Sequence, residues 1–368
     1  MKQGAGSLPV LSLRGVGKQF GDTWAARDVS LDAFDGEFVF LIGPSGCGKT
    51  TVLRMIGGYE TPSTGDILVR GQRVNDVPLD KRNIGMVFQS YALFPHMTVR
   101  ENIEYGLRMR NVPKPARRER SGAVMELVDL SAYGDRYPAQ LSGGQRQRVA
   151  LARVIVLEPD IMLLDEPLAN LDRRMRDVMR VELRKLQEKI GITTLYVTHD
   201  QEEALTMADR IVVMQEGRVL QVGTPPEVYN SPGNPFVSRF LGETSHFEGV
   251  VAQSLDGGGL KVDIGSGVAI CLRDNAGAHR PGERVGVSIR PERVTVSAQP
   301  DPSAPNQWRG TVSFVSYYGS HVVYLVDVDG TPHQLRASEA IPDGVARFVV
   351  GDEVHASCRV EHPTCVAL

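Results

Sequence analysis

Short apolar runs alternate with longer mixed stretches along the first two thirds of the chain. Residues 10–16, 37–43, 161–167 and 193–200 are runs of this kind, and they predict β-strands. Buried strands separated by helical stretches are typical of a mainly parallel sheet, so this part predicts an α/β fold. Between about residues 90 and 160 the sequence becomes richer in charge and helical in pattern, which indicates an inserted helical subdomain.

A change in composition marks the end of this part. Pro225, Pro226, Pro232 and Pro235 interrupt regular structure, and we expect the domain boundary to follow them, so that the first domain covers residues 1–242. The remaining residues, 243–368, alternate between apolar and polar positions and contain many glycines. They predict an all-β domain.

The second domain repeats a sequence pattern. GERVGVSIRPE at 282–292 aligns with GDEVHASCRVE at 351–361, with Gly, Val, Ser, Arg and Glu at identical offsets. EGVVAQ at 248–253 and RGTVSF at 309–314 precede the two copies. Two similar β units packed together are the simplest interpretation, because internal self-similarity reports repeated structure; a chance match over so short a window is the alternative.

Composition narrows the class of protein. The chain has 368 residues and a formal net charge of −3, which argues against a general nucleic-acid binder. Its four cysteines lack metal-ligand spacing and suit a reduced cytosolic protein. No signal peptide or membrane-spanning run is evident, so we expect other chains to cross the membrane if this protein works there.

GPSGCGKT at 43–50 fits the phosphate-binding pattern G-x-x-x-x-G-K-[ST] and follows an apolar strand, as that pattern requires. Glycines allow backbone N–H groups to converge on phosphate oxygens, and the following helix directs its positive end to the same place. Lys49 is expected to reach the β and γ phosphates, and Thr50 to bind Mg²⁺. The predicted phosphate-binding set is Gly43, Pro44, Ser45, Gly46, Cys47, Gly48, Lys49, Thr50 and Thr51.

Two acidic residues end the apolar run IMLLDE. Asp165 lies at the carboxyl end of this predicted strand, where ligands bind in open α/β sheets, and is expected to hold Mg²⁺. Glu166 can accept a proton from an attacking water. His199 ends the strand TTLYVT and could donate a hydrogen bond to the γ phosphate or that water; a structural histidine is the alternative.

LSGGQ at 141–145 opens a second predicted helix. The hydroxyl of Ser142 and the amides of Gly143 and Gly144 could form an anion site at the helix N-terminus, although an ordinary N-cap serine is the local alternative. The chain therefore carries two candidate phosphate-binding helix N-termini that are far apart in sequence.

The ordered set of motifs over about residues 8–240 resembles the ATP-binding cassette (ABC) ATPases. GPSGCGKT is similar to Walker A, IMLLDE to Walker B and LSGGQ to the signature motif. Gln89 in VFQS is similar to the Q-loop, Asp172 in LANLD to the D-loop, and His199 to the switch histidine. Phe20 falls where the family places an aromatic ring that stacks on adenine.

The resemblance implies an ATPase that uses ATP and Mg²⁺. Two copies would dimerise head to tail, so that Ser142, Gly143, Gly144 and Gln145 of one copy contact ATP held by Lys49 of the other. The implied roles are catalytic for Glu166, His199 and Gln89, metal-binding for Thr50, Gln89 and Asp165, and nucleotide-binding for Phe20 and Asp172.

The C-terminal half narrows the subgroup. The segment 221–243 and the repeated β domain resemble importer ATPases of the maltose, iron and polyamine group, whose extension is an OB-like TOBE domain. The segments 240–251 and 315–326 favour the polyamine branch. This implies a homodimer on the cytoplasmic face of the cell membrane, bound to two integral-membrane permease subunits and served indirectly by an extracytoplasmic solute-binding protein, with no nucleic acid as partner.

The segment 90–110 resembles the part of these importers that receives a helix of the membrane subunit. Tyr91, Phe94, Pro95 and Met97 would then line an apolar groove, whereas ordinary core is the alternative. Two other functions stay open at this point. One is a soluble ABC ATPase that acts on nucleic acid or ribosomes, and the other is a non-catalytic nucleotide-binding regulator, against which Glu166 and His199 argue.

Overall fold

The computed structural model describes residues 8–274 and 279–368 and divides into two compact units, residues 1–225 and 226–368. The first unit contains the predicted α/β fold with its helical insertion, and the second is dominated by β-strands, so the predicted fold class is confirmed. None of the described helices combines the length and the apolar character needed to cross a membrane.

A six-stranded sheet forms the centre of the first unit. Its order is β10-β9-β3-β8-β7-β6, and all neighbours are parallel except the edge strand β10. The four apolar runs of the sequence include β3, β7 and β8, whose residues are all buried, as strands covered on both faces must be. The strands are β3 (Phe38–Ile42), β6 (Ile84–Val87), β7 (Ile161–Asp165), β8 (Thr193–Thr198), β9 (Arg210–Gln215) and β10 (Arg218–Gly223).

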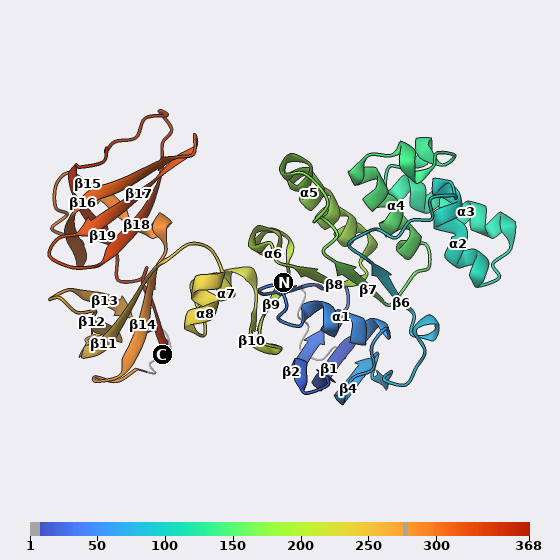
Figure 1. Ribbon diagram of the computed structural model, residues 1–368, viewed down its shortest axis with the longest axis horizontal. Coiled ribbons are helices and arrows are strands. Elements are labelled where there is room, and N and C mark those ends of the chain that lie inside the picture. Colours follow the sequence, from blue (N-terminus) through green and yellow to red (C-terminus); the bar gives the residue numbers. More distant parts are fainter. Residues whose placement is uncertain (1–7, 275–278) are drawn as a thin grey trace. The chain divides into compact units, whose positions relative to one another are not determined.

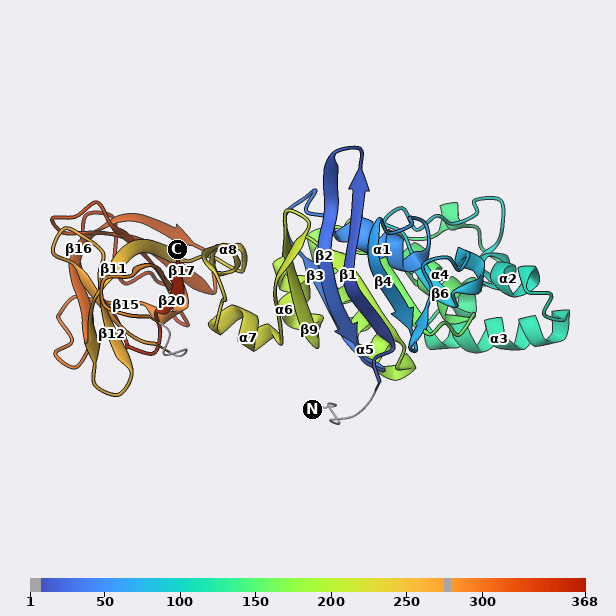
Figure 2. The same cartoon turned by 90° about the horizontal axis from the view of Figure 1, so that it is seen from below.

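A second, antiparallel sheet lies beside it, and helix α1 (Lys49–Gly57) packs between the two sheets (Figures 1 and 2). Val52, Leu53, Met55 and Ile56 of α1 are fully buried, which is the spacing of a helix with one broad apolar face. The strands of this sheet, in the order β2-β1-β4-β5, are β1 (Leu11–Phe20), β2 (Thr23–Ala33), β4 (Thr64–Val69) and β5 (Gln72–Arg73).

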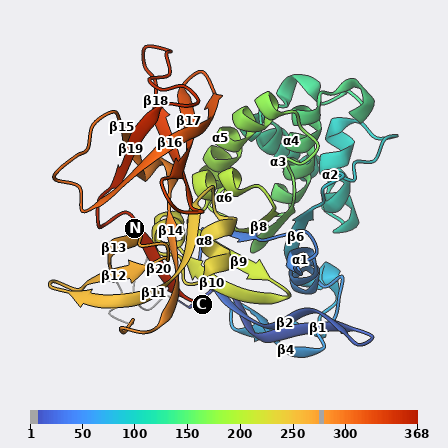
Figure 3. The ribbon, with the colours of Figure 1, turned by 60° about the vertical axis from the view of Figure 1, so that its left-hand side comes forward.

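Helices α5 (Arg173–Ile190) and α6 (Gln201–Met207) cover the opposite face of the six-stranded sheet from α1 (Figure 3). The predicted helical insertion lies at one end of the unit (Figure 1). It contains α2 (Val99–Met109), α3 (Lys114–Leu127) and α4 (Gly143–Ile155), with short 3-10 turns at Ser131–Tyr133 and Pro138–Gln140. A further 3-10 turn, Leu79–Lys81, precedes β6.

The second unit begins with two short helices, α7 (Pro225–Asn230) and α8 (Pro235–Phe240), followed by two five-stranded antiparallel sheets. The first sheet has the order β13-β12-β11-β14-β20 and the second β15-β19-β16-β17-β18. The strands are β11 (Ser245–Leu255), β12 (Gly259–Asp263), β13 (Ala269–Arg273), β14 (Arg284–Ile289), β15 (Thr295–Ser297), β16 (Asn306–Tyr317), β17 (His321–Val328), β18 (Gln334–Ala340), β19 (Glu353–Cys358) and β20 (Thr364–Ala367), with a 3-10 turn at Pro291–Arg293.

The repeated residues occupy equivalent strands of these two sheets. β11 lies between β12 and β14 as β16 lies between β17 and β19, and the aligned copies fall on β14 and β19. Gly249 and Gly310 take the same place: a Cβ at Gly249 would lie 2.6 Å from the backbone oxygen of Asp263, and one at Gly310 would overlap that of Asp327. The two sheets share one apolar core and exchange their fifth strands, because β15 follows β14 but pairs with β19, and β20 follows β19 but pairs with β14.

The division between the units falls earlier than the predicted boundary at residue 242. Tyr229, which follows the prolines, lies in the second unit, where its hydroxyl donates to Glu292 at 2.8 Å and its ring stacks against the guanidinium of Arg290 at 4.1 Å. Pro225 and Pro235, which were expected to interrupt regular structure, instead begin helices α7 and α8, since proline is well tolerated in the first turn of a helix.

Candidate nucleotide site

The phosphate-binding loop connects the end of β3 to the start of α1, as predicted. Gly48 is the N-cap of α1 with φ of 102°, and a Cβ at this position would overlap the backbone oxygen of Ala25. A Cβ added at Gly43, which has φ of 155°, would likewise overlap the backbone oxygen of Met214. Only glycine fits these two positions, and the resulting loop leaves room for a group that binds to backbone N–H donors.

Lys49 folds back across this loop. Its Nζ donates to the carbonyl oxygens of Gly43 at 2.8 Å and Pro44 at 2.9 Å, and the residue is only 5% exposed. Cys47 is also buried, with its Sγ 3.7 Å from the same Nζ. A buried ammonium group at a helix N-terminus matches the charge of a polyphosphate.

Thr50 and Asp165 meet beside the loop. The hydroxyl of Thr50 donates to Oδ1 of Asp165 at 3.2 Å, and burial raises the pKa of this carboxyl group above its ordinary value. Hydroxyl and carboxylate oxygens suit Mg²⁺, which usually takes few protein ligands and completes its shell with water and phosphate oxygens. Among the described residues no group of three His, Cys, Asp or Glu side chains could hold a metal alone.

Gln89, Glu166 and His199 come together at the ends of three adjacent strands, β6, β7 and β8. Nδ1 of His199 lies 3.1 Å from Oε1 of Glu166, and Nε2 of Gln89 donates to Oε2 at 3.4 Å. Glu166 has a φ of 44°, uncommon for a residue with a side chain, and its backbone N–H donates to Val197 O at 3.0 Å. Strained backbone of this kind clusters at functional sites.

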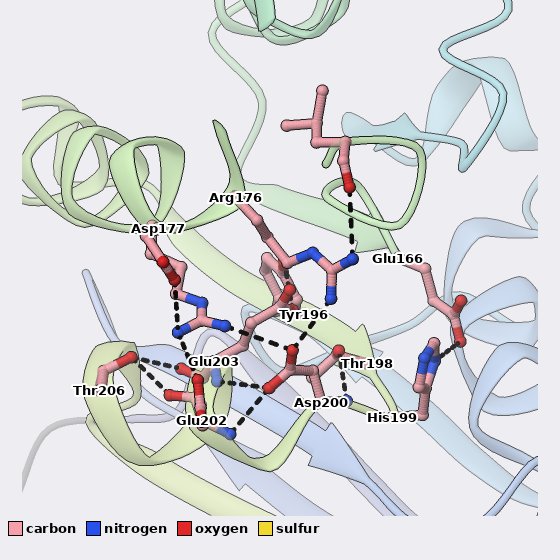
Figure 4. A network of polar contacts seen from close by, with 12 residues as sticks. Glu166, Arg176, Asp177, Tyr196, Thr198, His199, Asp200, Glu202, Glu203 and Thr206 are labelled. Carbon is pink, nitrogen blue, oxygen red and sulfur yellow. Dashed lines mark hydrogen bonds and ion pairs between the residues drawn. The ribbon is translucent and has the colours of Figure 1, made fainter. Parts of the chain in front are cut away.

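A second group of polar contacts surrounds Asp200, the residue that follows His199 in the sequence (Figure 4). Oδ1 of Asp200 accepts the N–H groups of Glu202 and Glu203 and so caps α6, while Oδ2 lies 3.4 Å from both Arg176 and Arg180 on α5. Sequence reasoning missed this cluster. Its only local signal was an aspartate immediately before a helical pattern, which is typical of an N-cap.

The turn between β7 and α5 contacts the same site. Nδ2 of Asn170, a residue missed in the sequence, donates to the backbone oxygen of Gln89 at 2.7 Å. Asp172, predicted to bind nucleotide, is the N-cap of α5 and accepts the N–H of Met175 at 2.9 Å. Arg176 also donates to the backbone oxygen of Leu171 at 3.3 Å. The turn is thus tied to both Gln89 and Asp200.

The signature residues are organised among themselves. Ser142 is the N-cap of α4: its Oγ accepts the N–H of Gln145 at 3.3 Å, and Oε1 of Gln145 accepts the N–H of Ser142 at 2.9 Å. Gly143 and Gly144 form the first turn of the helix. Figure 1 shows α4 and α1 well separated within the unit, so the chain presents its two candidate phosphate-facing helix starts at different places.

Two other predicted positions differ in environment. Phe20 ends β1 with 49% of its surface exposed and with Lys18 Nζ 4.9 Å from the ring centroid, which leaves a ring face available for stacking. Tyr91 is only 5% exposed and belongs to the core, so its assignment to an open apolar groove was wrong. Phe94 and Met97 are half-buried and Pro95 is exposed, in agreement with a surface segment.

Comparison with known proteins agrees with this geometry. Residues 26–169 match the family described as ABC transporter, and residues 287–365 match the TOBE domain. Relatives that bear the name spermidine/putrescine import ATP-binding protein PotA include the following three. The one from Nitratidesulfovibrio vulgaris is 45% identical over 90% of this chain and 89% of its own; that from Rubrobacter xylanophilus is 46% identical over 88% and 86%; that from Chromobacterium violaceum is 44% identical over 96% and 98%.

Solved structures resemble the first unit. cbiO1 from Clostridium perfringens, part of the ABC transporter complex cbiONQ, has a TM-score of 0.56 and 30% identity, covering 60% of this chain and 90% of its own. The cassette MJ0796, a dimer in a post-hydrolysis state bound to ADP and phosphate, has a TM-score of 0.52 and 33% identity over 58% and 98%.

Proposed function

Because this chain belongs to the ATP-binding proteins of ABC transporters, we propose that it hydrolyses ATP to drive the import of a polyamine, of the spermidine or putrescine class. One observation supports the catalytic part of the proposal. Lys49 lies across the phosphate-binding loop and Thr50 contacts Asp165 beside it, while Glu166 directly follows Asp165 at the end of β7. The solute is inferred from relatives at 43–46% identity that are named for spermidine and putrescine import.

The residues divide the work of hydrolysis as follows. Lys49 and the loop amides hold the β and γ phosphates, and the face of Phe20 receives the adenine. Thr50, Asp165 and Gln89 hold Mg²⁺, which neutralises charge on the phosphate oxygens. Glu166 accepts the proton of the attacking water. His199 contacts one of its carboxylate oxygens and Gln89 contacts the other, so both orient the group.

The separated signature supports a second part of the proposal. Ser142, Gly143, Gly144 and Gln145 contact the γ phosphate of ATP bound to another copy of the chain, and Asp172 lies at the same junction. The capping arrangement of Ser142 supports this role, because it fixes a hydroxyl beside the amides of Gly143 and Gly144 at the N-terminal end of α4. ATP then joins the two copies, and its hydrolysis separates them.

The proposed partners follow from the importer class. Two integral-membrane permease subunits anchor the homodimer at the cytoplasmic face of the cell membrane, and an extracytoplasmic solute-binding protein delivers the polyamine to them. The half-buried and exposed residues Phe94, Pro95 and Met97 belong to the surface that receives a permease helix. Action on nucleic acid or ribosomes finds no support, since the relatives are import proteins.

Reconstitution tests the proposal. The full chain is assembled with its two permease subunits in liposomes that contain MgATP, and radiolabelled spermidine is supplied with the solute-binding protein outside. Uptake together with stimulated phosphate release is expected, and Glu166→Gln should abolish both. ATP hydrolysis that RNA or DNA stimulates, with no uptake, would instead support the function on nucleic acid. Uptake of a different solute would show that only the proposed substrate is wrong.

A further inference from the structure

Arg153 lies in the last turn of α4, at the opposite end from Ser142. Its guanidinium does not point into solvent but binds the loop that follows Gln89. One nitrogen donates to the backbone oxygen of Ala92 at 2.7 Å and the other to that of Tyr91 at 3.1 Å. The planar fork of arginine suits two carbonyl groups at neighbouring positions.

The two residues that Arg153 binds have an unusual backbone. Tyr91 has φ of 62° and Ala92 φ of 47°, so two consecutive residues with side chains are left-handed. Such residues persist only where the surrounding structure over-determines their conformation. A turn closed by the N–H of Tyr91 and the oxygen of Phe88 at 2.8 Å encloses Gln89 and Ser90, so Gln89 lies in the turn that leads into the strained pair, two residues before Tyr91.

Contacts around Arg153 show that the guanidinium is committed to this loop. It lies 5.7 Å from the centroid of Phe94, and burial lowers its pKa, with Tyr59 close enough to oppose that effect. In the described part of the chain it forms no ion pair with a carboxylate. Asn102 holds the other end of the same loop through the backbone of Phe94 and Met97.

The strained pair connects two functional regions. Gln89 donates to Glu166 at 3.4 Å, whereas α4, the helix that carries Arg153, begins at the signature residue Ser142. A 13-residue α-helix is about 20 Å long and is stiff on that scale. A shift of α4 would therefore reach the backbone of Tyr91 and Ala92, in the loop that follows Gln89, through the two hydrogen bonds of Arg153.

From these contacts we infer that Arg153 is a positioning residue for Gln89. It holds Tyr91 and Ala92 in the left-handed conformation that directs Gln89 toward Glu166, and it links that orientation to the position of the signature helix. The inference rests on the proposed role of Gln89 in hydrolysis and extends it, because it makes the order of the active site depend on α4.

Kinetics of the full chain, assembled with its permease subunits, test this inference. Arg153→Gln should lower kcat by about 10- to 100-fold, the usual effect of misplacing a catalytic group, and leave the KM for ATP nearly unchanged because the phosphate-binding loop is intact. Arg153→Lys keeps the charge but loses the two-pronged geometry of the guanidinium, so its kcat should lie between those of wild type and Arg153→Gln.

Relief of the strain provides the decisive measurement. Glycine adopts positive φ freely, so Ala92→Gly should restore at least about fivefold of the lost kcat in the Arg153→Gln background, and change wild-type kcat by less than about twofold. Arg148→Gln is the matched control, since Arg148 is also on α4 but binds Glu182 and Asp129. Ala92→Gly should restore nothing there.

Three results would overturn the inference. The first is a normal kcat for Arg153→Gln, and the second is a loss of kcat that Ala92→Gly does not reverse. The third is a wild-type rate for Gln89→Ala, a variant that is measured in parallel to separate the role of Gln89 from the role of Arg153. If Gln89→Ala hydrolyses ATP at the wild-type rate, the role of Gln89 is wrong and the inference fails with it; if Gln89→Ala is slow and Arg153→Gln is normal, only the role of Arg153 is wrong.

Discussion

Nδ1 of His199 lies 3.1 Å from Oε1 of Glu166, although 33 residues of sequence separate them. Each follows the last residue of its strand, Asp165 of β7 or Thr198 of β8, and these two strands are parallel neighbours. The parallel register therefore places both side chains at one edge of the sheet. The contact orients a carboxylate whose own backbone is strained. Glu166 directly follows Asp165, which accepts a hydrogen bond from Thr50 next to the phosphate-binding loop, and a general base is needed in this region.

Replacement of this base should separate binding from hydrolysis. Glu166→Gln keeps the shape of the side chain and a partner for His199, but an amide cannot accept the proton of water. We expect ATP to bind normally while kcat falls by roughly 10²- to 10⁴-fold. Equilibrium binding of a fluorescent ATP analogue and phosphate release measure the two quantities. Wild-type hydrolysis by this variant would show that another group is the base.

The dimer model predicts a change in mass. In Glu166→Gln, bound ATP is not consumed, so light scattering on purified protein should show a shift from monomer to dimer when MgATP is added. Ser142→Arg in the same background should prevent the shift, because a bulky cation replaces the N-cap hydroxyl of α4. Lys49→Ala should also prevent it, by weakening ATP binding itself. Dimers that persist with Ser142→Arg would show that the signature does not contact the partner's ATP.

The side chain of Asp200 both caps α6 and pairs with two arginines of α5, and substitution can separate these two roles. Asparagine caps helices as well as aspartate, so Asp200→Asn should retain α6 and lose only the attraction to Arg176 and Arg180. Because Arg176 also binds Leu171 O beside the D-loop, we expect kcat to fall about three- to tenfold while the melting temperature changes little. Steady-state hydrolysis and thermal unfolding measure these effects.

Two further variants interpret that result. Asp200→Ala removes the cap as well, and should cost about 1 kcal/mol of stability in addition. Glu202→Gln disrupts another ion pair of Arg180, at 2.9 Å, but leaves Arg176 and Asp200 joined, and is expected to hydrolyse ATP normally. Equal losses of kcat in Glu202→Gln and Asp200→Asn would show that the network acts only by general stabilisation of α5.

Local patterns predicted the parts of this site that local sequence controls. The phosphate-binding loop, Glu166 and His199 each follow a buried strand, and Asp165 is the last residue of one. A parallel sheet brings such positions together. Asn170, Asp200 and Arg153 were missed because their contacts join residues distant in sequence, as between Arg153 and Ala92. Nothing near an arginine in a helical pattern reveals which backbone it binds.

Core and surface were also hard to separate by pattern. Tyr91 lies in a segment rich in apolar residues that resembled a surface groove. It is buried, however, its backbone is left-handed, and its hydroxyl has no hydrogen-bond partner in the described structure. The predicted boundary at residue 242 was placed after the prolines, whereas Tyr229, which precedes that boundary, contacts Arg290 and Glu292 of the second unit. In both cases tertiary contacts decide what the local pattern left open.

Glu203 predicts how stability depends on pH. It is buried on α6, and desolvation raises its pKa above the ordinary value of 4.5 despite hydrogen bonds from Thr198 and Tyr196. Below pH 4.5 the group is protonated in both folded and unfolded chains and carries no penalty. As the pH rises, the unfolded chain loses this proton first, so the contribution of Glu203 to stability falls between pH 4.5 and the raised pKa of the folded state, and stays lost above it.

Glu203→Gln should remove this dependence. Glutamine can accept the hydrogen bond of Tyr196 and cannot ionise, so the variant should match wild type near pH 4 and become the more stable protein as the pH approaches 8. Denaturant unfolding at a series of pH values measures the difference, and the exposed neighbour variant Glu202→Gln corrects for general effects of losing a negative charge. A stability difference between Glu203→Gln and wild type that does not grow with pH would mean that the carboxylate is compensated in the folded protein, for which the charge of Arg180 is available.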